Sequence, residues 1–363
     1  MQKEQITDKE AICLITIFIM GSTLIIGIGD IAKNDAWIAG IVGIIFSIPI
    51  LLIYSRVLSL YPGKDLYEIL NLVFGKYVGI LVSILYIWYA FHLGALVIHN
   101  FGEFINTVTM TKTPMFVPML CLGLVCIVAV SLGVEVISRT SAFFLPVMLF
   151  TIVTVLVLAI PKLHFDYLKP ILSQGFSPVL KGGFSIFSFP FAETVLFIGV
   201  FSSLKTKKSP YKVYFSGLFL AGTVIVILTI RNILMLGGLL GDLYFPSHAA
   251  VSRISIGNFL QRIEITVAFI FAIGVFIKTS VCLFVSCKGI ARLFNLKSYS
   301  SVTIQTGLLM IYFSQIVYDN IMDMKDWAFT VYQYYAFPFQ VVIPVIIWIF
   351  AEVKKKKINI PSA

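Results

Sequence analysis

The chain has 363 residues, of which 59% are hydrophobic and only 12% are charged, and its formal net charge is +10. Soluble domains carry about 25% charged residues, so this composition excludes a water-soluble globule. The positive charge does not indicate nucleic-acid binding, because the basic residues lie in short connections rather than on one aromatic-rich surface. The cysteines lie inside apolar runs without the spacing of a zinc site, so we expect neither a metal nor a cofactor.

Long apolar runs recur along the whole chain and predict an all-α polytopic membrane protein with a single transmembrane domain over residues 1–363. The runs have roughly the 18 to 25 residues that cross a hydrocarbon core. Backbone groups in lipid must bond within their own segment, which favours helices. We expect about ten spanning helices, in residues 10–32, 37–58, 77–106, 114–133, 141–160, 183–203, 212–237, 264–288, 302–319 and 330–352.

The distribution of lysine and arginine predicts the orientation of these helices. Basic residues near the ends of spans are retained on the cytoplasmic side. With ten crossings, 17 basic residues lie on the side that holds the N-terminus and eight lie on the other side. We therefore expect both termini to be cytoplasmic.

Two of the expected helices contain residues that interrupt a helix. The first helix contains Gly21, Ser22 and Thr23, and glycine is a poor helix-interior residue. The sixth helix contains the run 187–193, in which Pro190 removes a backbone hydrogen bond. These positions correspond in two five-helix halves, at about 10–160 and 183–352, and paired interruptions of this kind indicate a transporter-type binding site near the middle of the membrane.

Unwound turns leave free N–H and C=O groups, which can hold the carboxylate and the ammonium of a zwitterion. The alternative for the glycines of the first helix is that they only allow close helix packing. The candidate ligand-binding residues are Gly21, Ser22, Thr23, Phe187, Phe189, Pro190 and Glu193. For Glu193 we expect either contact with an ammonium group or proton transfer, with capping of the second half-helix as the alternative.

Ionisable side chains at membrane depth are costly and therefore mark functional candidates. His92, His99 and Glu103 lie on one side of the third expected helix. They form either a proton relay or a group of side chains that satisfy one another. Lys278, inside the eighth helix, needs a carboxylate or carbonyl partner or must lose its proton. A fixed ammonium at this position could take the place of a coupling sodium ion beside the first break. Arg231 either extends to the membrane surface or has an internal partner.

Several segments resemble the B subunits of bacterial spore germination receptors. The entry to the eighth helix has a similar Ile-x-x-Phe-x-x-Arg-Ile-Glu pattern, followed by Lys278 and a short basic segment at 289–297. The glycine-containing break at 21–23, the Ala-Trp-Ile at 36–38 and the Phe-Pro-Phe-x-Glu run that ends at Glu193 also match, whereas Gly29-Asp30-Ile31 stands where the family more often has Leu-Pro. The residues that match the pattern at the eighth helix are Ile256, Phe259, Arg262, Ile263 and Glu264.

The resemblance covers essentially the whole chain and implies a LeuT-like fold of the amino acid, polyamine and organocation transporter superfamily, with two inverted five-helix repeats. It also implies a receptor subunit that recognises a small nutrient germinant, such as an amino acid. Such B subunits work with a membrane A subunit and a C lipoprotein in the spore inner membrane.

Two other functions remain open from the sequence. A proton-coupled amino acid transporter would use His92, His99, Glu103 and Lys278 as coupling groups. An ion-channel subunit is less supported, because no filter sequence or run of pore-lining acids is present. No hydrolase, Walker, zincin or kinase motif is present, so we do not expect an enzyme.

Overall fold

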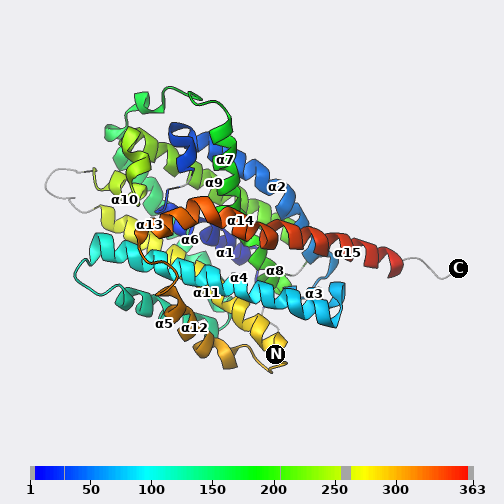
Figure 1. Cartoon of the computed structure of the whole chain (residues 1–363). Helices are drawn as coiled ribbons and strands as arrows, with labels where there is room; N and C mark the ends of the chain where they lie inside the picture. Colours follow the sequence, from blue (N-terminus) through cyan, green and yellow to red (C-terminus); the bar gives the residue numbers. More distant parts are fainter. Residues whose placement is uncertain (1–4, 28, 205, 255–262, 359–363) are drawn as a thin grey trace.

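The computed structural model describes residues 5–27, 29–204, 206–254 and 263–358 (Figure 1). These residues form helices joined by turns and loops, without a β-strand. The prediction of an all-α protein is therefore confirmed. The α-helices are α1 (Asp8–Met20), α2 (Ala36–Leu60), α3 (Leu66–Phe74), α4 (Lys76–Phe104), α5 (Phe116–Ser131), α6 (Val134–Ala159), α7 (Ser177–Ile186), α8 (Phe197–Val200), α9 (Ser209–Leu236), α10 (Pro246–Val251), α11 (Glu264–Leu293), α12 (Ser300–Ser314), α13 (Ile321–Asp326), α14 (Tyr332–Phe337) and α15 (Ile343–Ile358).

Each of the ten expected spans coincides with a helix or with a row of consecutive helices. Seven helices of the described chain, counting such rows as one, are long and apolar enough to cross a membrane. The remaining three are shorter, since α1, α5 and α12 have 13, 16 and 15 residues. The total of ten crossings, the orientation and the division into two repeats therefore stay predictions.

Some boundaries differ from those expected. Helix α6 begins at Val134, directly after Gly133 (φ 101°), rather than near residue 141, and Glu135 and Arg139 form an ion pair of 3.3 Å one turn apart within it. The last expected helix begins earlier, at Ile321, and continues through α13, α14 and α15. The Ile256, Phe259 and Arg262 positions of the family pattern lie outside the described residues, and α11 begins at Glu264.

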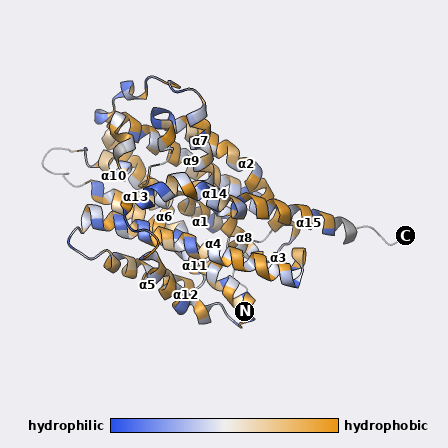
Figure 2. Cartoon of the chain, viewed as in Figure 1, coloured by the Kyte–Doolittle hydropathy of each residue, from blue (hydrophilic) through white to orange (hydrophobic). Residues whose placement is uncertain are grey.

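The arrangement of exposed and buried side chains fits a bundle surrounded by lipid. Helix α1 lies near the middle of the bundle (Figure 1), against α6, α9 and α11, and all its residues from Cys13 to Met20 are buried. Large apolar side chains such as Phe143 and Phe150 of α6 and Leu309 of α12 are exposed. Apolar residues run along the helices, while hydrophilic residues gather mainly toward their ends and connections (Figure 2). The outer apolar surface is thus placed to contact hydrocarbon.

Helices α2 and α7 pack through a seam of small residues. A Cβ atom added at Gly43 would lie 2.7 Å from Ile186 Cγ2 and 3.2 Å from the Gly183 carbonyl oxygen. A Cβ added at Gly183 would lie 2.5 Å from Val42 Cγ1. The two backbones therefore approach each other more closely than any larger residue would allow, as is common between helices in membranes. This seam fixes α7, the helix that leads into the second break.

We expect Gly43→Leu to lower the melting temperature of the purified protein, at a cost of about 1–3 kcal/mol for overpacking. The matched control is Gly238→Leu, because a Cβ at Gly238 has no atom within 4 Å. Thermal unfolding in detergent measures both variants. Equal melting temperatures for the two variants would show that the seam does not constrain the fold.

Candidate functional site

The first break lies at Gly21, where α1 ends and a 3₁₀ turn, η1 (Ser22–Leu24), begins. This break packs directly on α11. A Cβ added at Gly274 would lie 3.0 Å from Gly21 Cα, and one added at Gly21 would lie 2.9 Å from Lys278 Cδ. Both roles expected for Gly21, a helix interruption and close helix packing, therefore apply, because Gly21 ends α1 and lies in close contact with α11.

The second break follows α7. A π-helical turn, η6 (Phe187–Phe191), contains Phe189 in an extended conformation (φ −127°, ψ 108°), and a 3₁₀ turn, η7 (Ala192–Leu196), leads into α8. Pro190, which has no backbone N–H, occupies this turn. The predicted interruptions of the first and sixth helices are thus both confirmed.

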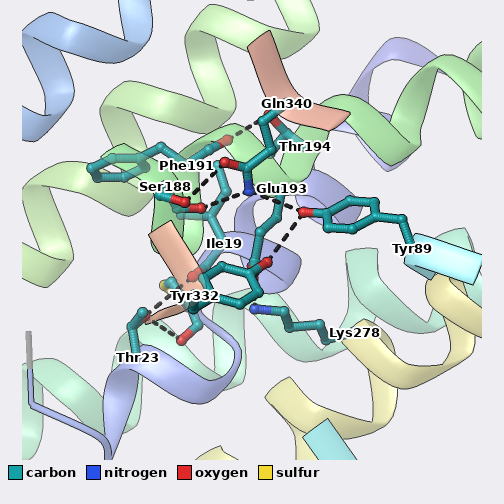
Figure 3. A network of polar contacts seen from close by, with 11 residues as sticks. Ile19, Thr23, Tyr89, Ser188, Phe191, Glu193, Thr194, Lys278, Tyr332 and Gln340 are labelled. Carbon is teal, nitrogen blue, oxygen red and sulfur yellow. Dashed lines mark hydrogen bonds and ion pairs between the residues drawn. The ribbon is translucent and has the colours of Figure 1, made fainter. Parts of the chain in front are cut away.

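The two breaks meet at an ion pair between Glu193 and Lys278 (Figure 3). Lys278 Nζ donates to Glu193 Oε2 at 2.5 Å, and neither side chain has any exposed surface. The ammonium also lies 4.7 Å from the ring centroid of Phe189 and 5.3 Å from that of Phe18, within the range of cation–π attraction. Tyr332 donates to the other carboxylate oxygen, Oε1, at 2.6 Å. Both oxygens of Glu193 are therefore bonded to groups of the protein.

A chain of polar side chains extends from this pair to the row α13–α15. The hydroxyl groups of Tyr332 and Tyr89 are 3.1 Å apart, and Gln340 Nε2 donates to Tyr89 Oη at 2.9 Å. Gln340 also donates to the Ser188 carbonyl oxygen and accepts from Ser188 Oγ, both at 2.9 Å. Figure 3 shows these side chains converging on the second break. The network holds the break against α4 and the last helices.

A cavity of about 330 Å³, including the space at its opening, adjoins the ion pair. Only about 20 Å³ of it is wide enough for a water molecule. Glu193, Phe189 and Tyr332 line it together with Asn100 of α4. Asn100 Oδ1 is buried without a hydrogen-bond partner among the described residues. Such an atom is costly to bury unless something binds it.

The structure brings Gly21, Phe189, Glu193 and Lys278 into one cluster. The other candidate ligand-binding residues have different surroundings. Ser22 Oγ, next to Gly21, is buried without a partner in the described chain, whereas Thr23 Oγ1 donates to carbonyl groups at the end of α1. Pro190 is buried in the turn, and the ring of Phe187 stacks on that of Phe184 at 6.0 Å rather than lining the cavity.

The three polar residues of α4 do not form one connected group. His92 stacks on Trp88 at 5.4 Å and contacts the rings of Trp327 and Tyr335 at their edges. His99 Nδ1 lies 2.8 Å from the Ser314 carbonyl oxygen, and Glu103 accepts from Thr107. In the described part of the chain no hydrogen bond joins any two of the three. They therefore do not satisfy one another, which was the alternative to a proton relay.

Four polar residues at this site were missed by the sequence reasoning. Asn100 and Gln340 are amides inside long apolar helices, and this position was a usable signal, because polar groups at membrane depth need partners. Tyr89 and Tyr332 gave no such signal, because tyrosine is frequent in this chain, with 16 residues.

Solved structures with this fold are membrane transporters. Mhp1, a nucleobase-cation-symport-1 family transporter in a closed conformation with bromovinylhydantoin bound, matches with a TM-score of 0.72 at 10% identity, over 95% of this chain and 78% of that chain. MhsT in complex with L-phenylalanine matches with a TM-score of 0.67 at 14% identity, over 97% of this chain and 89% of that chain. The predicted LeuT-like fold is confirmed, and identities this low carry the fold alone.

Sequence relatives identify the family. Spore germination protein KB of Bacillus subtilis (strain 168) is 30% identical over 362 residues, which cover 98% of this chain and 97% of the relative. Spore germination protein B2 of the same strain is 22% identical over 376 residues, which cover 98% and 97% of the two chains. The family model described as spore germination protein matches residues 5–322. This multi-pass membrane protein, with its buried ion pair between two interrupted helices, belongs to the spore germination protein family.

Proposed function

We propose that this chain is the germinant-sensing B subunit of a spore germination receptor, and that a small nutrient such as an amino acid binds between the two breaks. The observation that carries the proposal is the cavity at their junction, which presents the unpartnered Asn100 Oδ1 beside the Glu193 carboxylate. Both groups are hydrogen-bond acceptors. They fit the ammonium group of an amino acid.

The rest of the cavity fits an apolar part of the ligand. Leu93 and Val97, on the same face of α4 as Asn100, and Trp327 are among its apolar lining residues. A few fixed polar groups in an otherwise apolar pocket are typical of small-molecule sites. Ser22 Oγ, at the first break, is a further polar atom that a ligand can engage. Asn100 and Tyr332 are therefore added to the ligand-binding residues that we propose from the sequence.

The cavity is narrow, and we propose that its widening by a bound ligand is the conformational change that signals the ligand's presence. A ligand larger than water must widen the cavity, which moves apart lining groups that now touch, such as the Tyr332 hydroxyl and the Glu193 carboxylate at 2.6 Å. A ligand shifts an equilibrium only by its different affinity for the two states. The widened arrangement is therefore the one that the ligand favours, and the membrane A subunit and the C lipoprotein in the spore inner membrane read it.

A proton-coupled amino acid transporter is the second candidate. The observation that favours it is the buried Glu193–Lys278 pair inside a fold shared with transporters, because a carboxylate and an amine in contact can exchange a proton. His92, His99 and Glu103 would be further coupling groups in this function. Flux through the isolated subunit separates the two candidates.

Asn100→Leu tests the cavity. The substitution removes the unpartnered acceptor with little change in volume, so we expect the protein to accumulate normally. Loss of a hydrogen bond to an ammonium group, worth about 1.5–3 kcal/mol, should raise the half-maximal germinant concentration roughly 10- to 100-fold. Spores carrying the exposed-site control Asn71→Leu should germinate at the original concentration. An unchanged dose response in Asn100→Leu would refute the binding site.

The ion pair is tested with single and double substitutions. Glu193→Gln leaves Lys278 buried without its carboxylate, which costs about 3–5 kcal/mol, so receptor levels should fall. Adding Lys278→Met removes the stranded charge and should restore receptor levels. Immunoblots measure the receptor levels, and germination assays measure the germinant concentration that gives a half-maximal response. If the restored double variant responds at the wild-type germinant concentration, the pair has only a structural role.

Uptake into liposomes distinguishes sensing from transport. The purified subunit is reconstituted, and labelled amino acids that trigger germination are added with and without a pH gradient. We expect saturable binding without accumulation. Accumulation that depends on the gradient and is lost in the Glu193→Gln, Lys278→Met double variant would establish transport instead.

A further inference from the structure

Arg231 of α9 is a buried cation without a counterion. Its side chain is 5% exposed, and its Nε and Nη2 donate to Asn232 Oδ1 at 3.1 and 2.6 Å. No carboxylate of the described chain lies within ion-pair distance of it. The other buried lysine and arginine side chains are Lys278, paired with Glu193 at 2.5 Å, and Lys288, which lies 3.7 Å from Asp65. Among the described residues, Arg231 is thus the one buried cation that has no carboxylate within 4 Å.

An uncompensated charge at this depth is costly, and arginine cannot lose its proton to avoid the cost. Among the described residues, the acceptor that the guanidinium contacts is a neutral amide oxygen. That amide belongs to Asn232, whose Nδ2 donates to Ser247 Oγ of α10 at 3.1 Å. Since Ser247 accepts this bond, its own hydroxyl hydrogen remains to be donated. Arg231 Nη1 and the Ser247 hydroxyl are therefore donors without an acceptor in the described part of the chain.

These donors face a cavity. Arg231 and Ser247 are its polar lining, and the rest is apolar, including Leu24 of η1, Ile152 and Val155 of α6 and Ile270 of α11. The empty space is about 320 Å³, of which about 20 Å³ is wide enough for a water molecule. A site of this width takes one small ion or one terminal group. No residue of this cavity lines the cavity beside Glu193, so the two are separate.

We infer that this second cavity binds a small monovalent anion, either a free ion such as chloride or the carboxylate group of a small solute. The guanidinium supplies the charge, Ser247 supplies a hydroxyl donor, and the apolar wall excludes larger hydrated ions. The anion would also tie three elements together, because the lining comes from α9, from α10 and from Leu24 just after the first break. This site goes beyond germinant recognition and does not depend on it.

The test measures the melting temperature of the purified full-length protein in detergent at constant ionic strength. Sodium gluconate, whose anion is too bulky for the cavity, is replaced stepwise by sodium chloride in one series and by sodium acetate in another. We expect a saturable rise of roughly 2–4 °C, as for a ligand that binds only the folded state. Saturation with chloride identifies a free ion, and saturation with acetate alone identifies a carboxylate group.

Arg231→Gln should abolish the rise, whatever its own melting temperature, while the exposed neighbour Arg253→Gln should retain it. If Arg231→Gln does not fold, Ser247→Ala replaces it, and the concentration needed for the half-maximal rise should increase several-fold. The absence of a saturable rise with either anion in the wild-type protein overturns the inference. An unchanged rise in Arg231→Gln, or an unchanged concentration dependence in Ser247→Ala, overturns it as well.

Discussion

The ion pair between Glu193 and Lys278 is the interaction on which the centre of this protein depends. Water is not present in the middle of a bilayer to solvate either charge, so each requires the other. The pair joins the turn after the second break to α11, and α11 in turn packs on the first break through Gly274. Two interrupted segments that are far apart in the sequence are thereby held at one point.

The three buried cations illustrate three ways of placing charge inside an apolar bundle. Lys278 has a carboxylate in direct contact. Lys288, near the end of α11, bonds to the Gly199 carbonyl oxygen at 3.1 Å and has the Asp65 carboxylate at 3.7 Å. Arg231 has an amide and a cavity. A buried pair contributes little net stability compared with apolar residues, but opening it is expensive. A ligand that separates such a pair must therefore offset a large energetic cost through its own contacts.

Much of the fold could be predicted from the sequence, because hydropathy and helix interruption are local properties. The apolar runs predicted where the helices lie, and glycine and proline predicted where both breaks lie. The start of α6 at Val134 was missed, because residues 134–140 were expected to connect two spans, whereas they form the first two turns of α6. Helix α3 was also missed. It is only nine residues long, and its start is fixed by a capping box between Asp65 and Glu68.

The site could be predicted only in part, because partner choice depends on which helices become neighbours. The sequence indicated that Lys278 needed a partner and that Glu193 lay at a break, but not that each would be bonded to the other. Likewise, His92 and His99 share a face of α4 as expected, yet α12 and the π-helical turn η10 (Trp327–Val331) decide what they contact. Tertiary contacts of this kind have no local signature.

The row α13–α15 contains a second π-helical turn, η11 (Pro338–Val342), and Gln340 lies within it. Tyr332 and Gln340 are eight residues apart, which in a regular helix would place their side chains about 80° apart around the axis. A π turn advances by a smaller angle per residue, so it brings the two side chains closer to one azimuth. The spacing of residues, and not only their identity, therefore sets this part of the site. Loss of Pro338 or Phe339, the residues of η11 that precede Gln340, would turn Gln340 away from Ser188, although no residue of the hydrogen-bond network itself would be removed.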